Sequence, residues 1–312
     1  MPLDIAYSIE VEDFIDPDKA YDLYWSGVIR DNKAFVCPGT DCLAQVTCAN
    51  LYVESQNMKV VPHFRIYGAH SQDCEIFNQK NVSFIQEPLA TQQKERNPIS
   101  SATVDKFILA RPESYYDLDT KNKSVNLAEK QKRVRARKVV KSAELRKTGF
   151  IGNIYSVRMI VSRYIRYSKD GTIDHRFINI KGKDVSFKGF LKLIAKQKIS
   201  SLPSYELVYH GWAYIDKYEI GYRVKFINSL KNDNGEDLIT SFFIYDDLIE
   251  KYEIKNLVIS RIRKIVGLPR PKAYVFIYGK PQVVKSKKHG KYYANFKVSN
   301  LDYIDVNISA PF

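Results

Sequence analysis

Alternating hydrophobic and polar positions dominate the chain after residue 170 and predict a series of β-strands. Within 173–181, Ile173, His175 and Phe177 alternate with Asp174 and Arg176, and a period of two is typical of a strand with one buried face. Further strands are predicted at 206–215, 218–227, 238–245, 273–279, 291–298 and 301–308, and short helices at 187–196, 246–252 and 256–266. This mixture indicates an α+β domain built on an antiparallel sheet.

A helical period of 3.6 residues is clearest at 153–167. Five apolar or aromatic residues form one stripe at this spacing: Ile154, Val157, Val161, Tyr164 and Ile165. We expect this stripe to pack in the core. Arg158, Arg163 and Arg166 lie largely away from the stripe, where they could face phosphate groups.

The front of the chain has shorter patterns. A helix is predicted at 18–25, because Asp16, Pro17 and Asp18 resemble a helix start and Gly27 resembles a helix end. Strands are predicted at 34–36 and 60–64. Residues 78–103 are polar and read as a linker, whereas 105–116 fits either a helical turn or an edge strand.

Charge is distributed unevenly along the chain. The formal net charge is +14, but residues 1–120 carry −8, residues 121–147 carry +9 and residues 148–312 carry +13. A strongly basic surface favours a polyanionic partner, nucleic acid before anionic lipid. We expect that surface in the later two thirds of the chain. The acidic front suits a protein partner, or it shields the basic part.

The basic stretch at 121–147 is predicted to be a helix, because its central part is rich in helix formers and contains no Gly or Pro. Its candidate nucleic-acid contacts are Arg133, Arg135, Arg137 and Lys138. Only a thin apolar stripe accompanies these charges. A solvated arm or a helix that docks on a partner is therefore the alternative interpretation.

A second group of candidate contacts lies at a predicted hairpin tip near the C-terminus: Lys285, Lys287, Lys288, Lys291 and Tyr292. Single-stranded nucleic acid binds such surfaces, because phosphates attract lysines and bases stack on tyrosines. Alternation puts Tyr292 and Tyr293 on opposite faces, so at most one of them is expected to stack. The arrangement resembles the strand-and-loop binding face of an OB-fold. A solvated basic hairpin is the alternative.

All four cysteines and two of the five histidines lie between residues 35 and 76. Two short turns carry the candidate ligands, Cys37 with Cys42 and His70 with Cys74. Two ligands from each of two turns are typical of a tetrahedral Zn²⁺ site. The sequence therefore predicts a Cys₃His zinc site with Zn²⁺ as the cofactor.

Cys48 and His63 are the two spare candidates in this stretch. Cys48 follows an apolar alternation and is predicted to be a buried free thiol, whereas His63 could replace His70 or orient a ligand. Disulfides and unrelated thiols are the alternatives. No secretory signal precedes the stretch, so we expect a reducing, cytoplasmic environment.

The cysteine stretch also carries a resemblance. Cys37-Pro38 with a second cysteine soon after, then Pro62-His63-Phe64, then His70 and Cys74, resembles the zinc-finger-like N-terminal module of competence-protein (CoiA-like) chains. In that family a CPxC…HFxH…C pattern precedes a nuclease-type domain. Here the first cysteine pair is more widely spaced, and His70 follows Phe64 by six residues rather than two. The resemblance covers about 40 of the 312 residues and implies a nucleic-acid-associated zinc module.

These patterns predict three parts: a zinc-ribbon-like module at 1–85, a linker and basic helix at 86–147, and a β-rich, OB-like α+β domain at 148–312. No apolar run approaches the roughly 18 residues of a membrane span, so we expect no membrane contact.

Other catalytic patterns give weaker signals. The sequence has no G-x-x-x-x-G-K-[ST] or G-x-G-x-x-G phosphate loop and no nucleophile triad. His210-Gly211 resembles the His-Gly of ADP-ribosyltransferases, but a core or edge histidine is the preferred interpretation. Glu206, Asp302 and Asp305 could form a nuclease site, although no Asp…Glu-x-Lys pattern accompanies them.

The favoured hypothesis is a non-catalytic, zinc-containing protein that binds single-stranded DNA or RNA. One alternative is a metal-dependent nuclease or another nucleic-acid-processing effector, acting in phage (antiviral) defence or DNA uptake. Another is an adaptor whose acidic front docks a larger enzyme. The choice between DNA and RNA stays open at this point.

Overall fold

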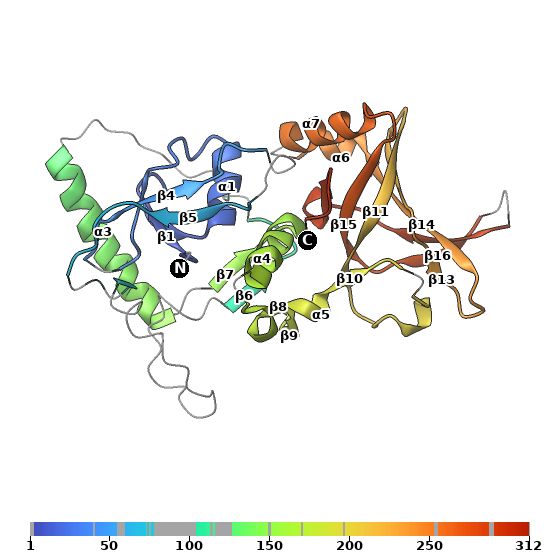
Figure 1. Cartoon of the computed structure of the whole chain (residues 1–312), viewed down its shortest axis with the longest axis horizontal. Helices are drawn as coiled ribbons and strands as arrows, with labels where there is room; N and C mark the ends of the chain where they lie inside the picture. Colours follow the sequence, from blue (N-terminus) through green and yellow to red (C-terminus); the bar gives the residue numbers. More distant parts are fainter. Residues whose placement is uncertain are drawn as a thin grey trace, which may run out of the picture. The chain divides into compact units, whose positions relative to one another are not determined.

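The chain folds into two compact units, both of which contain strands and helices (Figure 1). The computed structural model describes residues 3–39, 41–54, 60–72, 74, 76–77, 104–112, 115, 127–148, 151–169, 171–195, 197–252, 255–286 and 290–311. Unit 1 comprises Met1–Val53, Lys59–Lys106 and Ala110–Asn153, and unit 2 comprises Glu54–Met58, Phe107–Leu109 and Ile154–Phe312. The fold class is α+β. The predicted linker at 78–103 lies outside the described residues.

Unit 1 is built on a five-stranded sheet of order β2-β1-β3-β4-β5, in which neighbouring strands are antiparallel. Its strands are β1 (Ala6–Ser8), β2 (Asp13–Ile15), β3 (Phe35–Val36), β4 (Gln45–Ala49) and β5 (His63–Ile66). Phe35 and Phe64 are buried with their ring centroids 5.2 Å apart. The strand predicted at 34–36 is thus present, and the one predicted at 60–64 begins at His63.

Helix α1 (Pro17–Trp25) begins where the sequence predicts a helix start. Asp16 Oδ1 accepts hydrogen bonds from the main-chain N–H groups of Asp18 and Lys19 at 2.9 and 3.0 Å. This is the ordinary N-cap arrangement, with Pro17 in the first turn. The helix contacts β5 and buries Tyr21.

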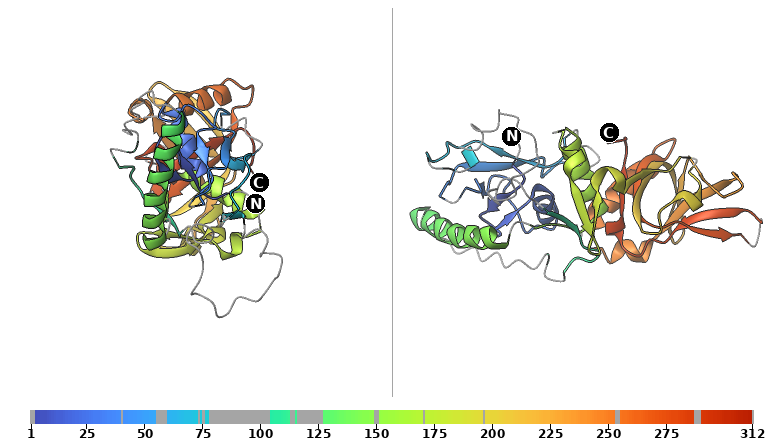
Figure 2. Two further views of the ribbon diagram at one scale, coloured as in Figure 1. Left: turned by 90° about the vertical axis from the view of Figure 1, so that its left-hand side faces the viewer. Right: turned by 90° about the horizontal axis from the view of Figure 1, so that it is seen from below.

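Helix α3 (Leu127–Thr148) also belongs to unit 1, where it lies against β2 (Figures 1 and 2). The basic stretch is therefore helical, as predicted. Within the described part of the chain, no helix is both long and apolar enough to cross a membrane.

Strands β6 (Val104–Phe107) and β7 (Ile151–Ile154) each include a point at which the chain passes from unit 1 to unit 2. The undecided pattern at 105–116 thus begins as a strand. The apolar stripe predicts that Ile154 belongs to the next helix. In the structure Ile154 is instead the last residue of β7.

Helix α4 (Val157–Lys169) contains the predicted amphipathic stripe, but two of its arginines do not face solvent. Arg163 and Arg166 are 1% and 8% exposed. The helix contacts β15, β18 and two short 3-10 turns at 173–175 and 301–303, so neighbours cover more than one of its sides. The expectation that Arg163 and Arg166 face phosphate groups is therefore wrong, because both side chains are buried.

The segment after α4 departs from the predicted strand and helix. Strands β8 (Phe177–Ile180) and β9 (Lys183–Ser186) form an antiparallel hairpin. Helix α5 (Phe187–Phe190) is a single turn, and the chain continues as β10 (Leu191–Leu193), which pairs with β11. The helix predicted at 187–196 is therefore mostly wrong, because pairing with a distant strand overrides the local preference. A 3-10 turn at 199–201 follows.

Unit 2 is organised by a nine-stranded sheet of order β16-β17-β14-β12-β11-β15-β18, with β10 pairing with β11 and β13 with β14. The remaining strands are β11 (Leu207–Tyr218), β12 (Gly221–Phe226), β13 (Leu230–Lys231), β14 (Asp237–Tyr245), β15 (Lys272–Gly279), β16 (Gln282–Lys285), β17 (Tyr292–Phe296) and β18 (Ile304–Asn307). Helices α6 (Asp246–Glu250) and α7 (Lys255–Val266) connect β14 to β15.

The turn between β11 and β12 lies three residues later than the sequence predicts. Tyr218 pairs with Gly221, so the turn is at 219–220 rather than at 216–217. Gly221 has φ +149°, and a Cβ there would lie 2.1 Å from the carbonyl oxygen of Ile244. Only glycine allows this approach of β14 to the turn.

The unit 2 sheet has a buried inner face and an exposed outer face. The inner face includes Ile215, Val224 and Phe242, which are all buried. Tyr209 of β11 and Phe296 of β17 have ring centroids 5.2 Å apart, although β12 and β14 separate these strands. The sheet is therefore strongly curved. The outer face is the side of β12, β14 and β17 that carries Arg223, Lys225, Ser241, Tyr293 and Asn295.

Candidate metal centre and candidate nucleic-acid interface

The four predicted metal ligands lie together in unit 1. One ligand atom from each of Cys37, Cys42, His70 and Cys74 lies within 4.8 Å of all the others. His70 Nδ1 is 3.6, 3.4 and 3.2 Å from the Sγ atoms of Cys37, Cys42 and Cys74, and the Sγ atoms of Cys37 and Cys74 are 3.8 Å apart. Three thiols and one imidazole at these distances could bind a metal ion.

The main chain brings the two ligand turns together. Cys37 N donates to the carbonyl of Ala44 at 2.8 Å, which closes the first turn, and Cys74 N donates to the carbonyl of Ser71 at 3.0 Å in the second. Gly68 lies between β5 and His70, and a Cβ there would be 2.6 Å from the main-chain nitrogen of Gln45. A glycine at this position lets the second turn approach the first.

The thiols of the cluster differ in their protonation. Burial raises the pKa of Cys37 and of Cys74. Burial also acts to raise the pKa of Cys42, but hydrogen bonds from the main-chain N–H groups of Ala44 and Ser71 outweigh it, and the pKa of Cys42 is lowered. Because its pKa is lowered, Cys42 is the thiol of the three that releases its proton most readily to a bound cation.

The two spare candidates lie outside the cluster. Cys48 is buried in β4 opposite Phe64. His63 Nδ1 is 2.9 Å from the carbonyl oxygen of Val61, and its Nε2 accepts a hydrogen bond from Arg65 Nε at 2.8 Å. None of the four cysteines, all of which are described, forms a disulfide.

Lys138 of α3 is not a surface residue. Its side chain is fully buried, and its Nζ donates hydrogen bonds to the main-chain carbonyls of Gly39 and Cys42. The proposal of a phosphate contact for Lys138 is therefore corrected, since its ammonium group is turned into the metal-ligand turn.

The three candidate arginines of α3 are exposed. Arg133 pairs with Glu12 at 3.1 Å, and Arg137 also pairs with Glu12. Arg135 is exposed. The acidic front therefore shields part of the basic helix, which was one of the two roles expected for it.

The basic hairpin is formed by β16 and β17. Lys285 Nζ lies 5.4 Å from the ring centroid of Tyr292, and both side chains are exposed. Lys291 is exposed as well, whereas Lys287 and Lys288 lie outside the described residues. Nucleic-acid contact by these residues stays a prediction.

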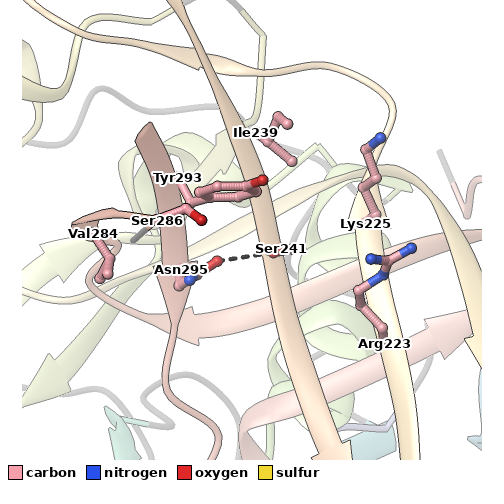
Figure 3. A pocket seen from close by; sticks show the side chains of 8 residues that line it. All are labelled: Arg223, Lys225, Ile239, Ser241, Val284, Ser286, Tyr293 and Asn295. Carbon is pink, nitrogen blue, oxygen red and sulfur yellow. Dashed lines mark hydrogen bonds between the residues drawn. The ribbon is translucent and has the colours of Figure 1, made fainter. Parts of the chain in front are cut away.

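A pocket of about 430 Å³ lies on the outer face of the unit 2 sheet (Figure 3). Arg223 and Lys225 of β12, Ser241 of β14, and Tyr293 and Asn295 of β17 contribute to its lining. Sequence reasoning missed this group because β17 lies far along the chain from β12 and β14. The alternation that separates Tyr292 from Tyr293 was the only local signal.

The remaining chemical candidates are engaged in structural contacts. Glu206 accepts hydrogen bonds from Lys181 and Tyr278, both at 2.8 Å. Asp305 pairs with Arg261, and His210 is buried with Nδ1 2.7 Å from Tyr274 Oη. His210 is thus a core residue, as preferred. Apart from the cysteine cluster, no group of three or more His, Cys, Asp or Glu side chains in the described part of the chain is arranged to hold a metal.

Comparisons with protein-family models, with curated proteins and with solved structures find no match for this chain.

Proposed function

We propose that this chain is a zinc-containing protein that binds single-stranded nucleic acid through the outer face of its unit 2 sheet. Unit 1 holds the metal in a zinc-ribbon-like arrangement of two ligand turns. Unit 2 supplies cations for phosphates and aromatic rings for bases. A reducing compartment such as the cytoplasm is part of this proposal, because the thiols must stay reduced to bind zinc.

The geometry of the cysteine cluster supports zinc. Zn–S bonds of about 2.3 Å in a tetrahedron place two sulfurs about 3.8 Å apart, and Cys37 Sγ and Cys74 Sγ are 3.8 Å apart. Thiolate and imidazole ligands also favour zinc over magnesium or calcium, which prefer oxygen. A site closed by four protein ligands leaves no open position for catalysis. Bound zinc would therefore have a structural role and would stabilise the fold of unit 1.

The strand order of unit 2 supports an OB-like barrel. With β11, β12 and β14 as the first three strands, β15 with β16 as the fourth and β17 as the fifth, the third and fifth strands pair in parallel, as in an OB-fold. The helices α6 and α7 lie between the third and fourth strands. OB-folds bind oligonucleotides on the face of strands 2 and 3 and on the loops beside it, which here are the outer face and the basic hairpin.

The observation that carries the proposal is the meeting of cations and aromatic rings on this outer face. The guanidinium carbon of Arg223 lies 5.2 Å from the ring centroid of Tyr218, and Lys225 is exposed two residues farther along β12. Residues 148–312 as a whole carry a net charge of +13. Phosphate attraction and base stacking both need such a surface.

Binding of the zinc-loaded protein to labelled single-stranded DNA, duplex DNA and RNA tests the proposal. We expect a preference for single strands and an affinity that falls steeply between about 50 and about 200 mM salt, because bound cations displace counterions. The metal content is measured on the same sample by mass spectrometry.

Other outcomes would point to the alternatives. Absence of binding to all three polymers at low salt would refute nucleic-acid recognition and leave the basic surface as a docking face for a protein. Shortened substrate in the presence of Mg²⁺ or Mn²⁺ would instead support the nuclease that the competence-protein resemblance implies.

A further inference from the structure

The outer-face pocket places three kinds of recognition group side by side. Tyr293 of β17 and Ile239 of β14 are register partners at one end of the pocket (Figure 3). Asn295 and Ser241 are the partners two residues farther along the same strands, and Lys225 pairs with Ser241 from β12. Paired residues of neighbouring strands project to the same face. An aromatic ring, an amide and an ammonium group therefore share one small surface.

We propose that this pocket binds one nucleotide of a single-stranded nucleic acid, with the base stacked on Tyr293 and the adjoining phosphate held by Arg223 and Lys225. The inference rests on the function proposed above and names the residues that would perform it. The pocket volume of about 430 Å³ falls within the range of about 300–1,000 Å³ that is typical of small-molecule sites.

Arg223 is held in position for this role. Its Nη2 is 2.8 Å from Asp216 Oδ2, and both side chains are more than 40% exposed. Such an exposed ion pair contributes little to stability, and a guanidinium has five N–H donors. Asp216 therefore orients Arg223 without using all of its donors, and a phosphate can bind the others.

Asn295 gives the pocket a means of choosing between bases. Ser241 Oγ donates a hydrogen bond to Asn295 Oδ1 at 2.8 Å (Figure 3). The amide oxygen is thereby used within the protein, and the amide NH₂ is the group presented to a ligand. It favours a base with a carbonyl, such as thymine, uracil or guanine, over adenine, which has an amino group at the corresponding position.

A second aromatic surface lies next to the pocket. Phe243 of β14 is 4.7 Å from Tyr245 and 6.1 Å from Tyr218, measured between ring centroids. Tyr218 and Tyr245 are 43% and 52% exposed. Arg223 borders both the pocket and Tyr218. The next base of the bound strand would therefore stack on this cluster, with Arg223 at the phosphate between the two bases.

Matched substitutions test the pocket in the full-length, zinc-loaded protein. Fluorescence anisotropy with labelled oligo-dT of about a dozen nucleotides gives Kd. We expect Tyr293→Ala to weaken binding by about five- to a hundredfold, the effect of losing one stacked base. Tyr52→Ala removes an exposed tyrosine from unit 1 and should leave Kd nearly unchanged. Circular dichroism and thermal unfolding verify that both variants fold.

The cations are tested by the salt dependence of binding. Lys225→Gln should reduce the slope of log K against log salt by about one unit, because one phosphate contact is lost. Lys217→Gln removes the same charge from the opposite face of the neighbouring strand, where Lys217 pairs with Tyr222, and should leave the slope unchanged.

Base choice is tested with Asn295→Asp, which replaces the donor by an acceptor. The ratio of the affinity for oligo-dT to the affinity for oligo-dA should fall. Gln282 is a register neighbour of Asn295, and Gln282→Glu adds the same charge but should leave this ratio unchanged. Binding by the wild type with no loss in Tyr293→Ala, or an equal loss in Tyr52→Ala, would overturn the pocket but keep the proposed function. Failure of the wild-type protein to bind any single strand would overturn both.

Discussion

The ammonium group of Lys138 donates a hydrogen bond to the main-chain carbonyl of Cys42, a residue of the metal-ligand cluster. A second hydrogen bond goes to the carbonyl of Gly39 in the same turn, and the Lys138 side chain is fully buried. Three thiolates around a divalent cation leave a net negative charge, which a buried ammonium nearby stabilises. The basic helix α3 thus supplies a structural cation to the acidic front of the chain.

Lys138→Met should destabilise unit 1 by about 2 kcal/mol or more, because two buried carbonyls lose their donor. Urea unfolding monitored by Trp25 fluorescence in a Trp212→Phe background measures this change, since Trp25 belongs to unit 1 and Trp212 to unit 2. Lys132→Met removes an exposed lysine from the same helix and should change stability by less than about 0.5 kcal/mol. Equal effects of the two substitutions would refute the structural role of Lys138.

Removal of the metal by a chelator should destabilise unit 1 and leave unit 2 nearly unchanged. When free zinc exceeds Kd a thousandfold, binding stabilises the folded state by about 4 kcal/mol. The unfolding midpoints reported by Trp25 and by Trp212, each in a single-tryptophan variant, separate the two units.

Cys42→Ser should lower the zinc content measured by mass spectrometry, because one of the four ligands is lost. Cys48→Ala is the matched control, since Cys48 is buried but lies outside the cluster. Zinc retained in full by Cys42→Ser would contradict the ligand set.

The stability of unit 2 should fall in mild acid because of His210. Burial lowers the pKa of His210 from 6.5 to about 4. The unfolded chain therefore takes up a proton first, so stability is complete above pH 6.5 and falls by up to about 3 kcal/mol as the pH drops toward 4. Urea midpoints from Trp212 fluorescence across this range measure the loss.

His210→Gln cannot take up this proton and should flatten the pH dependence of unit 2 between those two pH values. His175→Gln is the control, because His175 is exposed in the same unit. A decline in acid that is the same in the wild type and in His210→Gln would assign it to other groups.

The ion pair between Arg261 and Asp305 should be one of the costliest contacts in unit 2 to break. The two groups are 2.8 Å apart and their side chains are 6% and 5% exposed. Arg261→Met leaves a buried carboxylate without its cation, which costs about 3–5 kcal/mol. The exposed pair of Lys217 and Asp246 is the comparison, since Lys217→Met should cost at most about 1 kcal/mol. Calorimetric unfolding of both variants decides the matter.

Sequence patterns correctly predicted the helices and strands that depend mainly on residues close together in the chain. The start of α1 follows from the Asp16 side chain and Pro17, and the helical character of α3 follows from a stretch of helix formers. The strands of unit 2 were recognisable by alternation, because each has one buried face. The helix predicted at 187–196 failed since Leu191–Leu193 pairs with β11, a partner that no local pattern reveals.

The sequence by itself determined the class of the fold and the four candidate metal ligands, because thiols and imidazoles are rare and their spacing in two short turns is a local property. Only the tertiary structure decided which cations face solvent. Lys138 and Arg135 lie one turn apart on α3, yet Lys138 is buried against the metal-ligand turn and Arg135 is exposed. It also decided that Tyr293 rather than Tyr292 shares a pocket with Arg223, because register with strands distant in the chain sets the face on which each side chain lies.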